Sequence, residues 1–228
     1  MQVTKHIPNF LTLCNLACGC FGVVAVFKGD LQLGAMMIWA GALFDFFDGF
    51  AARMLKRYSL IGKDLDSLAD LVTFCFLPGA MLYWSIYQNA RWPWLAYSGF
   101  LLVVFGALRL SKFNNDTRQT ENFHGLPVPA SGIFVSALPF LLSAGFAGLS
   151  SDAMVVVLVG SAIFLSAMMV SDIRLMSLKF KNFSFNANRP RYLLLFVSLA
   201  LLALFKFIAL PLIIIWYLLL SLASNFKK

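Results

Sequence analysis

Long apolar stretches constrain the fold of this chain more than any other feature. Hydrophobic residues make up 61% of its 228 residues and charged residues only 12%, so a water-soluble domain with this composition would expose large apolar patches. About eight stretches approach the roughly 20 residues that an α-helix needs to cross a bilayer. They are residues 9–27, 31–55, 65–88, 92–111, 128–148, 153–171, 190–207 and 209–225. The sequence therefore predicts an all-α integral membrane protein.

Two longer polar segments interrupt these stretches. Residues 110–127 are rich in Asn, Asp, Thr, Gln and Gly and end in prolines, which predicts a loop that re-enters the bundle through proline-fixed turns. Residues 179–191 alternate aromatic side chains with Lys and Asn. That alternation is typical of a segment lying in the headgroup layer of a membrane.

The basic residues are distributed unevenly between the two sides of the predicted membrane. Fifteen of the 18 Lys and Arg residues fall on the side that holds the N-terminus, and the other side holds only Lys28, Arg91 and Lys206. The positive-inside rule then predicts that both termini, and the loop between the second and third stretches, are cytoplasmic. The net charge of +8 would attract anionic lipids and substrates to that face. Nucleic acid is a poor partner, because these residues sit in short loops at membrane ends.

Four aspartates lie where the second apolar stretch ends and the third begins. Asp45 and Asp48 are three residues apart, and Asp66 and Asp70 are four apart, so each pair occupies one face of its helix. The two stretches run in opposite directions, so all four carboxylates can point into one cleft. Asp64 is turned about 200° from Asp66 on an α-helix and is expected to face solvent. Carboxylates in a membrane are costly unless they are neutralised, which predicts bound cations or a proton path.

Oxygen donors without nearby His or Cys favour Mg²⁺ or Mn²⁺ over zinc or copper. Beside them, Gly49, Ala52 and Gly62 carry little side-chain bulk and would let a flat base or a phosphate approach the backbone. Arg53 can grip a phosphate with two parallel hydrogen bonds. These parts together predict phosphoryl transfer, in which metals polarise a diphosphate and a carboxylate receives a proton. The alternative from a different class is a cation transporter that uses the aspartates as its ion site.

The same residues form the pattern D-x-x-D-G-x-x-A-R-x8-G-x3-D-x3-D, which resembles the signature of the CDP-alcohol phosphotransferase family at every position. This resemblance implies a six-helix catalytic core, two divalent metal ions, a CDP-linked donor, release of CMP and a homodimer. By position, the metal ligands would be Asp45, Asp48, Asp66 and Asp70. Asp70 would also act as general base, and the nucleotide would be lined by Gly49, Ala52, Arg53 and Gly62. The catalytic domain would span residues 1–175, followed by an interfacial segment and a C-terminal transmembrane hairpin in residues 176–228.

Two further segments bear on the acceptor alcohol. Arg109–Asn114 and Phe123–Pro129 resemble the R-L-x-[RK]-F-N and F-x-G-L-P-x-P signatures of bacterial and archaeal phosphatidylserine synthases in this family. The resemblance implies CDP-diacylglycerol as donor and L-serine as acceptor. A zwitterionic amino acid needs a cation for its carboxylate, and Arg109 and Lys112 can provide one. The candidate serine-binding residues are Arg109, Lys112 and Asn114.

Other readings stay open at this point. Glycerol 3-phosphate or inositol phosphate are alternative acceptors for the same chemistry. The opening residues 7–16 are similar to the same synthases, and within them Asn9, Thr12 and Asn15 either line the nucleotide cleft or bond neighbouring helices. The expected location is the cell (inner) membrane, with the active site facing the cytoplasm.

Overall fold

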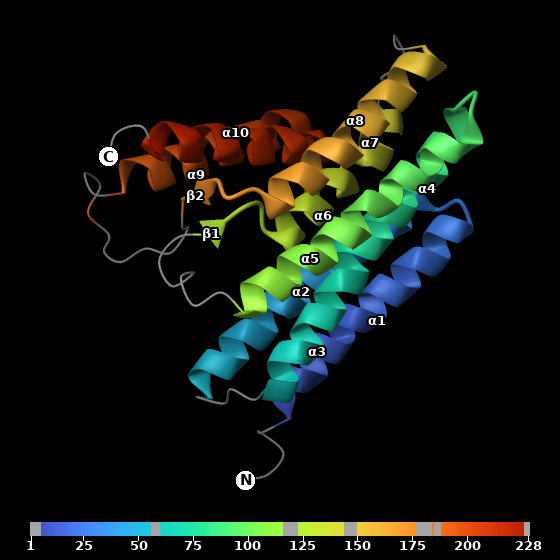
Figure 1. The fold of residues 1–228 in the computed structure, drawn as a ribbon. Helices are drawn as coiled ribbons and strands as arrows, with labels where there is room; N and C mark the ends of the chain where they lie inside the picture. Colours follow the sequence, from blue (N-terminus) through green and yellow to red (C-terminus); the bar gives the residue numbers. More distant parts are fainter. Residues whose placement is uncertain are drawn as a thin grey trace.

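Helices account for nearly all of the chain that the computed structural model describes, namely residues 6–55, 60–115, 123–143, 150–176, 184 and 188–225 (Figure 1). The α-helices are α1 (Ile7–Phe27), α2 (Leu31–Met54), α3 (Leu60–Asp70), α4 (Leu77–Asn89), α5 (Leu101–Asn115), α6 (Val128–Ser136), α7 (Leu138–Ser143), α8 (Ser151–Val170), α9 (Arg189–Phe205) and α10 (Ala209–Asn225). The shorter elements are the π-helix η2 (Leu71–Phe76), the 3₁₀-helices η3 (Pro93–Phe100) and η4 (Lys206–Ile208), and the strands β1 (Phe123–His124) and β2 (Arg174–Leu175).

Six helical stretches among these residues are long and apolar enough to cross a membrane, the last being Arg189–Ser224, which η4 divides into α9 and α10. The prediction of a multi-pass, helical integral membrane protein is therefore confirmed. The paired strands β1 and β2 are only two residues long and do not change this architecture. Which side of the membrane each end occupies stays a prediction.

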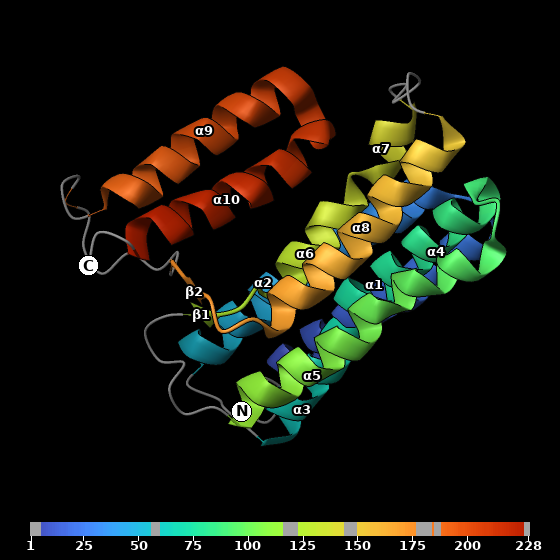
Figure 2. The ribbon, with the colours of Figure 1, turned by 45° about the horizontal axis from the view of Figure 1, so that its top comes forward.

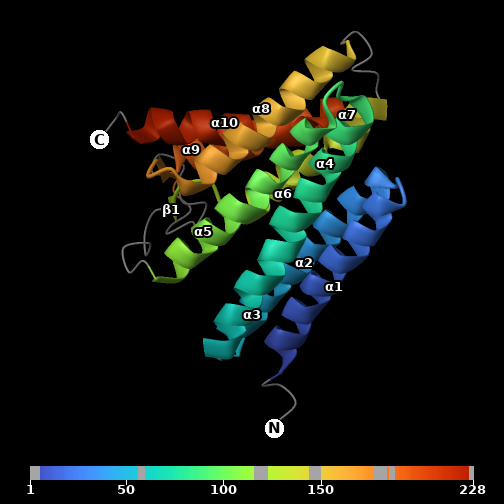
Figure 3. The same ribbon diagram turned by 45° about the vertical axis from the view of Figure 1, so that its right-hand side comes forward.

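The first two helices run antiparallel and form the most extensive helix pair of the bundle. The turn between them depends on Gly29, whose φ of +84° lies in a region that L side chains rarely adopt. Asp30 then caps α2 by accepting a hydrogen bond from the Leu33 amide at 2.9 Å. This antiparallel arrangement places the end of α2 beside the start of α1. The start of α3 and the end of α5 lie at the same end of the bundle (Figures 1 and 3).

The third span is continuous from Ile61 to Asn89 but contains the π-helix η2 in its middle. Pro78 follows this segment. A proline ring clashes with the carbonyl four residues earlier in an α-helix, and the wider π turn, in which the Leu77 amide bonds the Val72 carbonyl, relieves that clash. Segments of this kind occur mostly as single turns and often near functional sites.

Glycines from four helices face η2 and let it sit in the centre of the bundle. A Cβ atom at Gly41 of α2 would lie 2.5 Å from Thr73 Cγ2, and one at Gly19 of α1 would lie 2.6 Å from Thr73 Oγ1. Gly106 of α5 and Gly132 of α6 make the same kind of approach to Cys75 and Phe74. Small residues at such positions allow close helix packing in a membrane, so the neighbouring helices come close to the residues just after Asp70.

Two predicted boundaries were wrong. Residues 110–115 are helical and complete α5, so the loop predicted from Leu110 begins later. In this last turn Asn114 bonds Ser67 and Lys63 of α3. The stretch predicted over 128–148 breaks at Ala137 into α6 and α7, just before Pro139. Most of the predicted interfacial segment, at 179–183 and 185–187, lies outside the described residues.

The last two helices form a hairpin at one side of the main bundle (Figure 2), where α10 packs against α6. Its turn packs against α2 and α7, where Phe207 contacts Trp39 and Phe140 with ring centroids 4.5 and 4.9 Å apart. Farther along α10, the Tyr217 hydroxyl donates to the Met176 carbonyl at 3.0 Å, and the Met176 amide donates to Ser221 Oγ at 3.2 Å. Each helix has 17 residues, or about 25 Å at 1.5 Å per residue, so its crossing of the membrane stays a prediction.

Candidate metal centre

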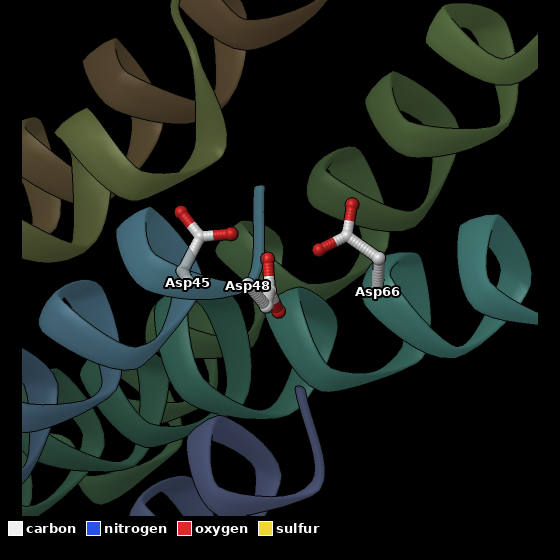
Figure 4. Close-up of side chains that lie close together, drawn as sticks. All are labelled: Asp45, Asp48 and Asp66. Atoms are coloured by element: carbon white, nitrogen blue, oxygen red, sulfur yellow. The ribbon is translucent and has the colours of Figure 1, made fainter. Parts of the chain in front are cut away.

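Three aspartates from two helices converge at one end of the bundle. Asp45 and Asp48 extend from α2 and Asp66 from α3, and each offers an oxygen atom within 4.8 Å of the others. Figure 4 shows the three carboxyl groups gathered between the two helices. Asp48 is buried, whereas Asp45 and Asp66 are half-buried, so the group is open on one side. An all-oxygen donor set at this spacing fits a hard divalent cation such as Mg²⁺ or Mn²⁺.

The fourth aspartate is buried, as Asp48 is. Asp70 is one helical turn beyond Asp66 and only 8% exposed, and its charge interacts with those of Asp45, Asp66 and Asp48. It is not one of the three residues whose oxygen atoms lie within 4.8 Å of one another. The structure thus brings all four predicted aspartates into one cluster, in which Asp48 and Asp70 are buried and Asp45 and Asp66 are half-buried.

Helix α1 supplies no acid but hydrogen-bonds two of the aspartates. Thr12 Oγ1 donates to Asp48 Oδ2 at 2.7 Å, and Asn15 Nδ2 donates to Asp70 Oδ1 at 3.3 Å. Both α1 residues are buried. Of the two readings left open by the sequence, the bonding of neighbouring helices is therefore observed for Thr12 and Asn15.

Thr73 belongs to the same cluster and was missed in the sequence. Its hydroxyl donates to the backbone carbonyl of Asn15 at 2.9 Å. The spacing of Asp66, Asp70 and Thr73 continues one helix face, and that spacing is the signal that could have identified it. By contrast, Asp64 is exposed, as predicted.

The residues predicted to line a nucleotide follow the aspartates along α2 and α3. Arg53 is exposed and reaches back along its helix, so that its Nη1 atom lies 3.6 Å from the position of a Cβ atom at Gly49. Ala52 and Gly62 are half-buried. A guanidinium group thus stands beside a helix surface with little bulk, next to the carboxylates.

The residues predicted to bind the acceptor differ in their surroundings. Arg109 is 4% exposed, and its guanidinium carbon lies 5.4 Å from the centre of the Phe113 ring, whereas Lys112 is exposed. Asn114 joins α5 to α3: its Nδ2 donates to Ser67 Oγ at 2.8 Å, and its carbonyl accepts from Lys63 Nζ at 2.6 Å. Of the three, only Arg109 is a buried cation.

Gly125, in the segment Phe123–Pro129 that resembles the second synthase signature, has a conformation and surroundings that exclude a side chain. Gly125 has a φ of +76°, and a Cβ atom there would lie 2.5 Å from the Met169 carbonyl oxygen. Its amide donates to the Ile173 carbonyl at 2.9 Å, and the Leu126 amide donates to the Met168 carbonyl at 2.8 Å. This segment therefore fastens the start of α6 to the end of α8.

The sequence of the helices that carry this cluster matches a known protein family. Residues 5–171 match the CDP-alcohol phosphatidyltransferase family, which covers every aspartate described above. The chain belongs to this family. It is thus a membrane-embedded CDP-alcohol phosphatidyltransferase of phospholipid biosynthesis, and the resemblance seen in its sequence is confirmed.

The sequence of this transferase is similar to those of several named enzymes. It is 36% identical to the CDP-diacylglycerol–serine O-phosphatidyltransferase of Bacillus subtilis over 155 residues, which cover 64% of this chain and 85% of that protein. The enzyme of the same name from Helicobacter pylori (strain J99) is 31% identical over 194 residues, covering 84% and 80% of the two chains. The archaetidylserine synthase of Methanothermobacter thermautotrophicus is 32% identical over 154 residues, covering 66% and 64%.

Proposed function

We propose that this transferase moves the phosphatidyl group from CDP-diacylglycerol to L-serine, producing phosphatidylserine and CMP. The observation that carries the chemistry is the convergence of Asp45, Asp48 and Asp66 within the region matched to the family. Serine as acceptor is supported by the relatives, several of which are named CDP-diacylglycerol–serine O-phosphatidyltransferase.

The cluster has the donors for the divalent ions on which the chemistry would depend. Asp45, Asp48 and Asp66 would hold one ion, and Asp70 would contribute to a second. When bound, the ions stabilise negative charge on the diphosphate of the donor. Arg53 would bind a phosphate of the nucleotide with its planar guanidinium, and Gly49, Ala52 and Gly62 would leave room for the nucleotide beside the helices.

The reaction exchanges one phosphorus–oxygen bond for another. The serine hydroxyl oxygen attacks the phosphorus that carries diacylglycerol, while Asp70 takes the hydroxyl proton as general base. The bond between that phosphorus and the oxygen bridging to CMP breaks, and CMP leaves with the electron pair. Asp70 suits this role because its burial beside the open carboxylates keeps bulk water away from the proton that it accepts.

Arg109 is the strongest candidate for holding the serine carboxylate. It is a buried guanidinium near the end of α5, the helix that Asn114 ties to α3 beside Asp66. A charge-assisted pair between guanidinium and carboxylate is stronger than a neutral hydrogen bond. Lys112 and Asn114 would assist at the exposed end of the same helix.

A direct assay tests the reaction and its acceptor. Purified protein is mixed with CDP-diacylglycerol, Mg²⁺ or Mn²⁺, and serine, glycerol 3-phosphate or inositol phosphate in turn, and both CMP and the lipid product are measured. We expect rapid CMP release and phosphatidylserine with serine alone. Transfer to glycerol 3-phosphate or inositol phosphate would replace serine while retaining the chemistry, and ion flux without CMP release would favour the transporter alternative.

The proposal also includes the membrane orientation of the active site and the association of two chains. The distribution of Lys and Arg supports an active site on the cytoplasmic side of the cell membrane, and the family resemblance supports a homodimer. Labelling of a cysteine placed at exposed Asp64 by a membrane-impermeant thiol reagent, in a variant lacking exposed Cys20, tests the orientation: the site should react in inverted vesicles and not in intact cells. Light scattering of the purified enzyme should give twice the mass of one chain.

A further inference from the structure

We propose that Asn15 is a positioning residue whose amide holds the carboxylate of Asp70 in the orientation needed to accept the acceptor's proton. This inference rests on the proposed function, because it assigns Asn15 a task only if Asp70 is the base. It concerns a residue of α1, the helix that contributes no carboxylate to the cluster.

The contact itself is buried. Asn15 Nδ2 donates to Asp70 Oδ1 at 3.3 Å, and the two residues are 0% and 8% exposed. A side-chain amide keeps its protons throughout the pH range in which enzymes work, so it remains a donor at every stage of a reaction. It therefore engages Oδ1 and leaves Oδ2 as the oxygen that receives the proton.

The backbone of Asn15 is held by the same segment that carries Asp70. Thr73, three residues after Asp70, donates its hydroxyl proton to the Asn15 carbonyl at 2.9 Å. Asn15 is thus bound at its side chain by the end of α3 and at its backbone by η2. Two contacts to consecutive turns fix both the position of Asn15 and its distance from Asp70.

The surroundings of the Asn15 side chain favour one orientation of its amide group. A Cβ atom at Gly41 would lie 2.8 Å from Asn15 Oδ1, and one at Gly19 would lie 2.6 Å from Thr73 Oγ1. Asn15 Oδ1 is buried and has no hydrogen-bond partner among the described residues. An amide rotated by half a turn would set this oxygen against an oxygen of Asp70, which is repulsive, so the donor faces the carboxylate.

Thr12 offers an internal comparison. It lies three residues before Asn15 on the same helix face and bonds Asp48 instead of Asp70. If each α1 side chain acts through the carboxylate that it touches, loss of the Thr12 hydroxyl should weaken metal binding through Asp48. Loss of the Asn15 amide should slow the proton-transfer step through Asp70.

The test replaces Asn15 by leucine, which has similar size and no donor. We expect kcat to fall about 10–100-fold, as small misplacements of reacting groups do, with KM for both substrates within about threefold of the native value. CMP binding measured by calorimetry should change by less than about threefold, as should Mn²⁺ binding at the ion held by Asp45, Asp48 and Asp66, measured by electron paramagnetic resonance. Thr12→Val should show the opposite pattern, with weaker Mn²⁺ binding. Ser85→Ala, which alters another buried hydroxyl on α4, should retain native activity.

A double-mutant cycle separates positioning from a general structural effect. In the Asp70→Asn background, adding Asn15→Leu should lower the residual rate by less than about twofold, because residues that act as a unit are not additive. Equal losses in both backgrounds, or a rise in KM at unchanged kcat, would overturn the inference. If the leucine variant folds poorly, Asn15→Ala gives the same comparison without added bulk. If the native enzyme transfers phosphatidyl groups to no alcohol, the proposed function fails and this inference fails with it.

Discussion

The aspartate end of the bundle and the C-terminal hairpin are built in opposite ways. The elements η2 and α4, which continue the helix that carries Asp66 and Asp70, bury many of their residues, whereas Leu194 is the one buried residue among those described in α9. The first region buries polar and charged side chains against one another: Thr12, Asn15, Asp48, Asp70 and Thr73. The second exposes long apolar side chains over most of its surface and is held by the contacts of Phe207, Tyr217 and Ser221.

This difference shows which region of the chain lowers the stability of the folded protein. Burying polar groups and charges is unfavourable unless each finds a partner, and four ionised carboxylates repel one another unless cations neutralise them. Such a cluster lowers stability and is expected only where chemistry needs it. The hairpin carries no comparable cost, since its apolar surface suits the hydrocarbon of a bilayer.

The largest difference between the two regions is expected when the proposed metal ligands are replaced. Replacing Asp45, Asp48 or Asp66 by alanine should lower the rate of CMP release by about 10³-fold or more, because charge on the diphosphate would lose its stabilisation. An excess of chelator should have the same effect on the native enzyme. Full turnover in the presence of chelator would exclude a role for divalent metals.

A somewhat smaller loss is expected at the general base. Asp70→Asn keeps the size and one oxygen of the side chain but accepts no proton, so CMP release should fall about 10²–10⁴-fold while CDP-diacylglycerol still binds. Rates and equilibrium binding are measured on the same preparation. The matched control is Asp64→Asn on the exposed face of α3, which should retain activity; equal sensitivity at the two positions would contradict the assignment of helix faces.

Loss of the proposed carboxylate partner should affect one substrate alone. Arg109→Ala should raise KM for serine about 10–100-fold, the effect of losing a hydrogen bond to a charged group, and leave KM for CDP-diacylglycerol nearly unchanged. Serinamide, which lacks the carboxylate, should be a poor acceptor for the native enzyme and lose little more in the variant. Similar losses with serine and serinamide would place Arg109 outside the serine site.

The smallest effect is expected in the hairpin. Tyr217→Phe removes the hydrogen bond to the Met176 carbonyl and should lower the free energy of unfolding by about 1 kcal/mol, seen as a modest fall in the thermal midpoint in detergent. Activity should stay within about twofold of native. A tenfold or larger loss of kcat would show that the hairpin takes part in the reaction and would remove the contrast between the two regions.

Much of the site could be predicted from local patterns. Asp45, Asp48, Asp66 and Asp70 lie on two adjacent antiparallel helices with spacings of three and four, so their faces follow from helix geometry alone. The exposure of Asp64 follows from the same geometry. The contact of Thr12 with Asp48 could not be predicted in this way, because it joins residues on different helices and depends on how α1 packs.

Other features depend on neighbours that no local pattern identifies. A proline disturbs an α-helix, but the close approach of Gly41 and Gly106 to the π turn involves other helices and is seen only in the structure. The polar residues up to Asn115 predict a loop, yet α5 continues because Ser67 and Lys63 bind Asn114. The position of Gly125 in a signature indicates that it matters, and only the carbonyl of Met169 beside it explains why a side chain does not fit.

The membrane setting, the four aspartates and the family could all be inferred without a structure, because hydropathy, helix period and motif spacing are properties of short stretches of chain. Only the packing of the helices shows that Thr12 and Asn15 bond different carboxylates, that Asp48 and Asp70 are the buried members of the cluster, and that α10 packs against α6. The physical reason is that burial and hydrogen-bond partners are set by packing between distant segments. A residue's type and spacing limit what it can do, and its neighbours in space determine which of those possibilities it adopts.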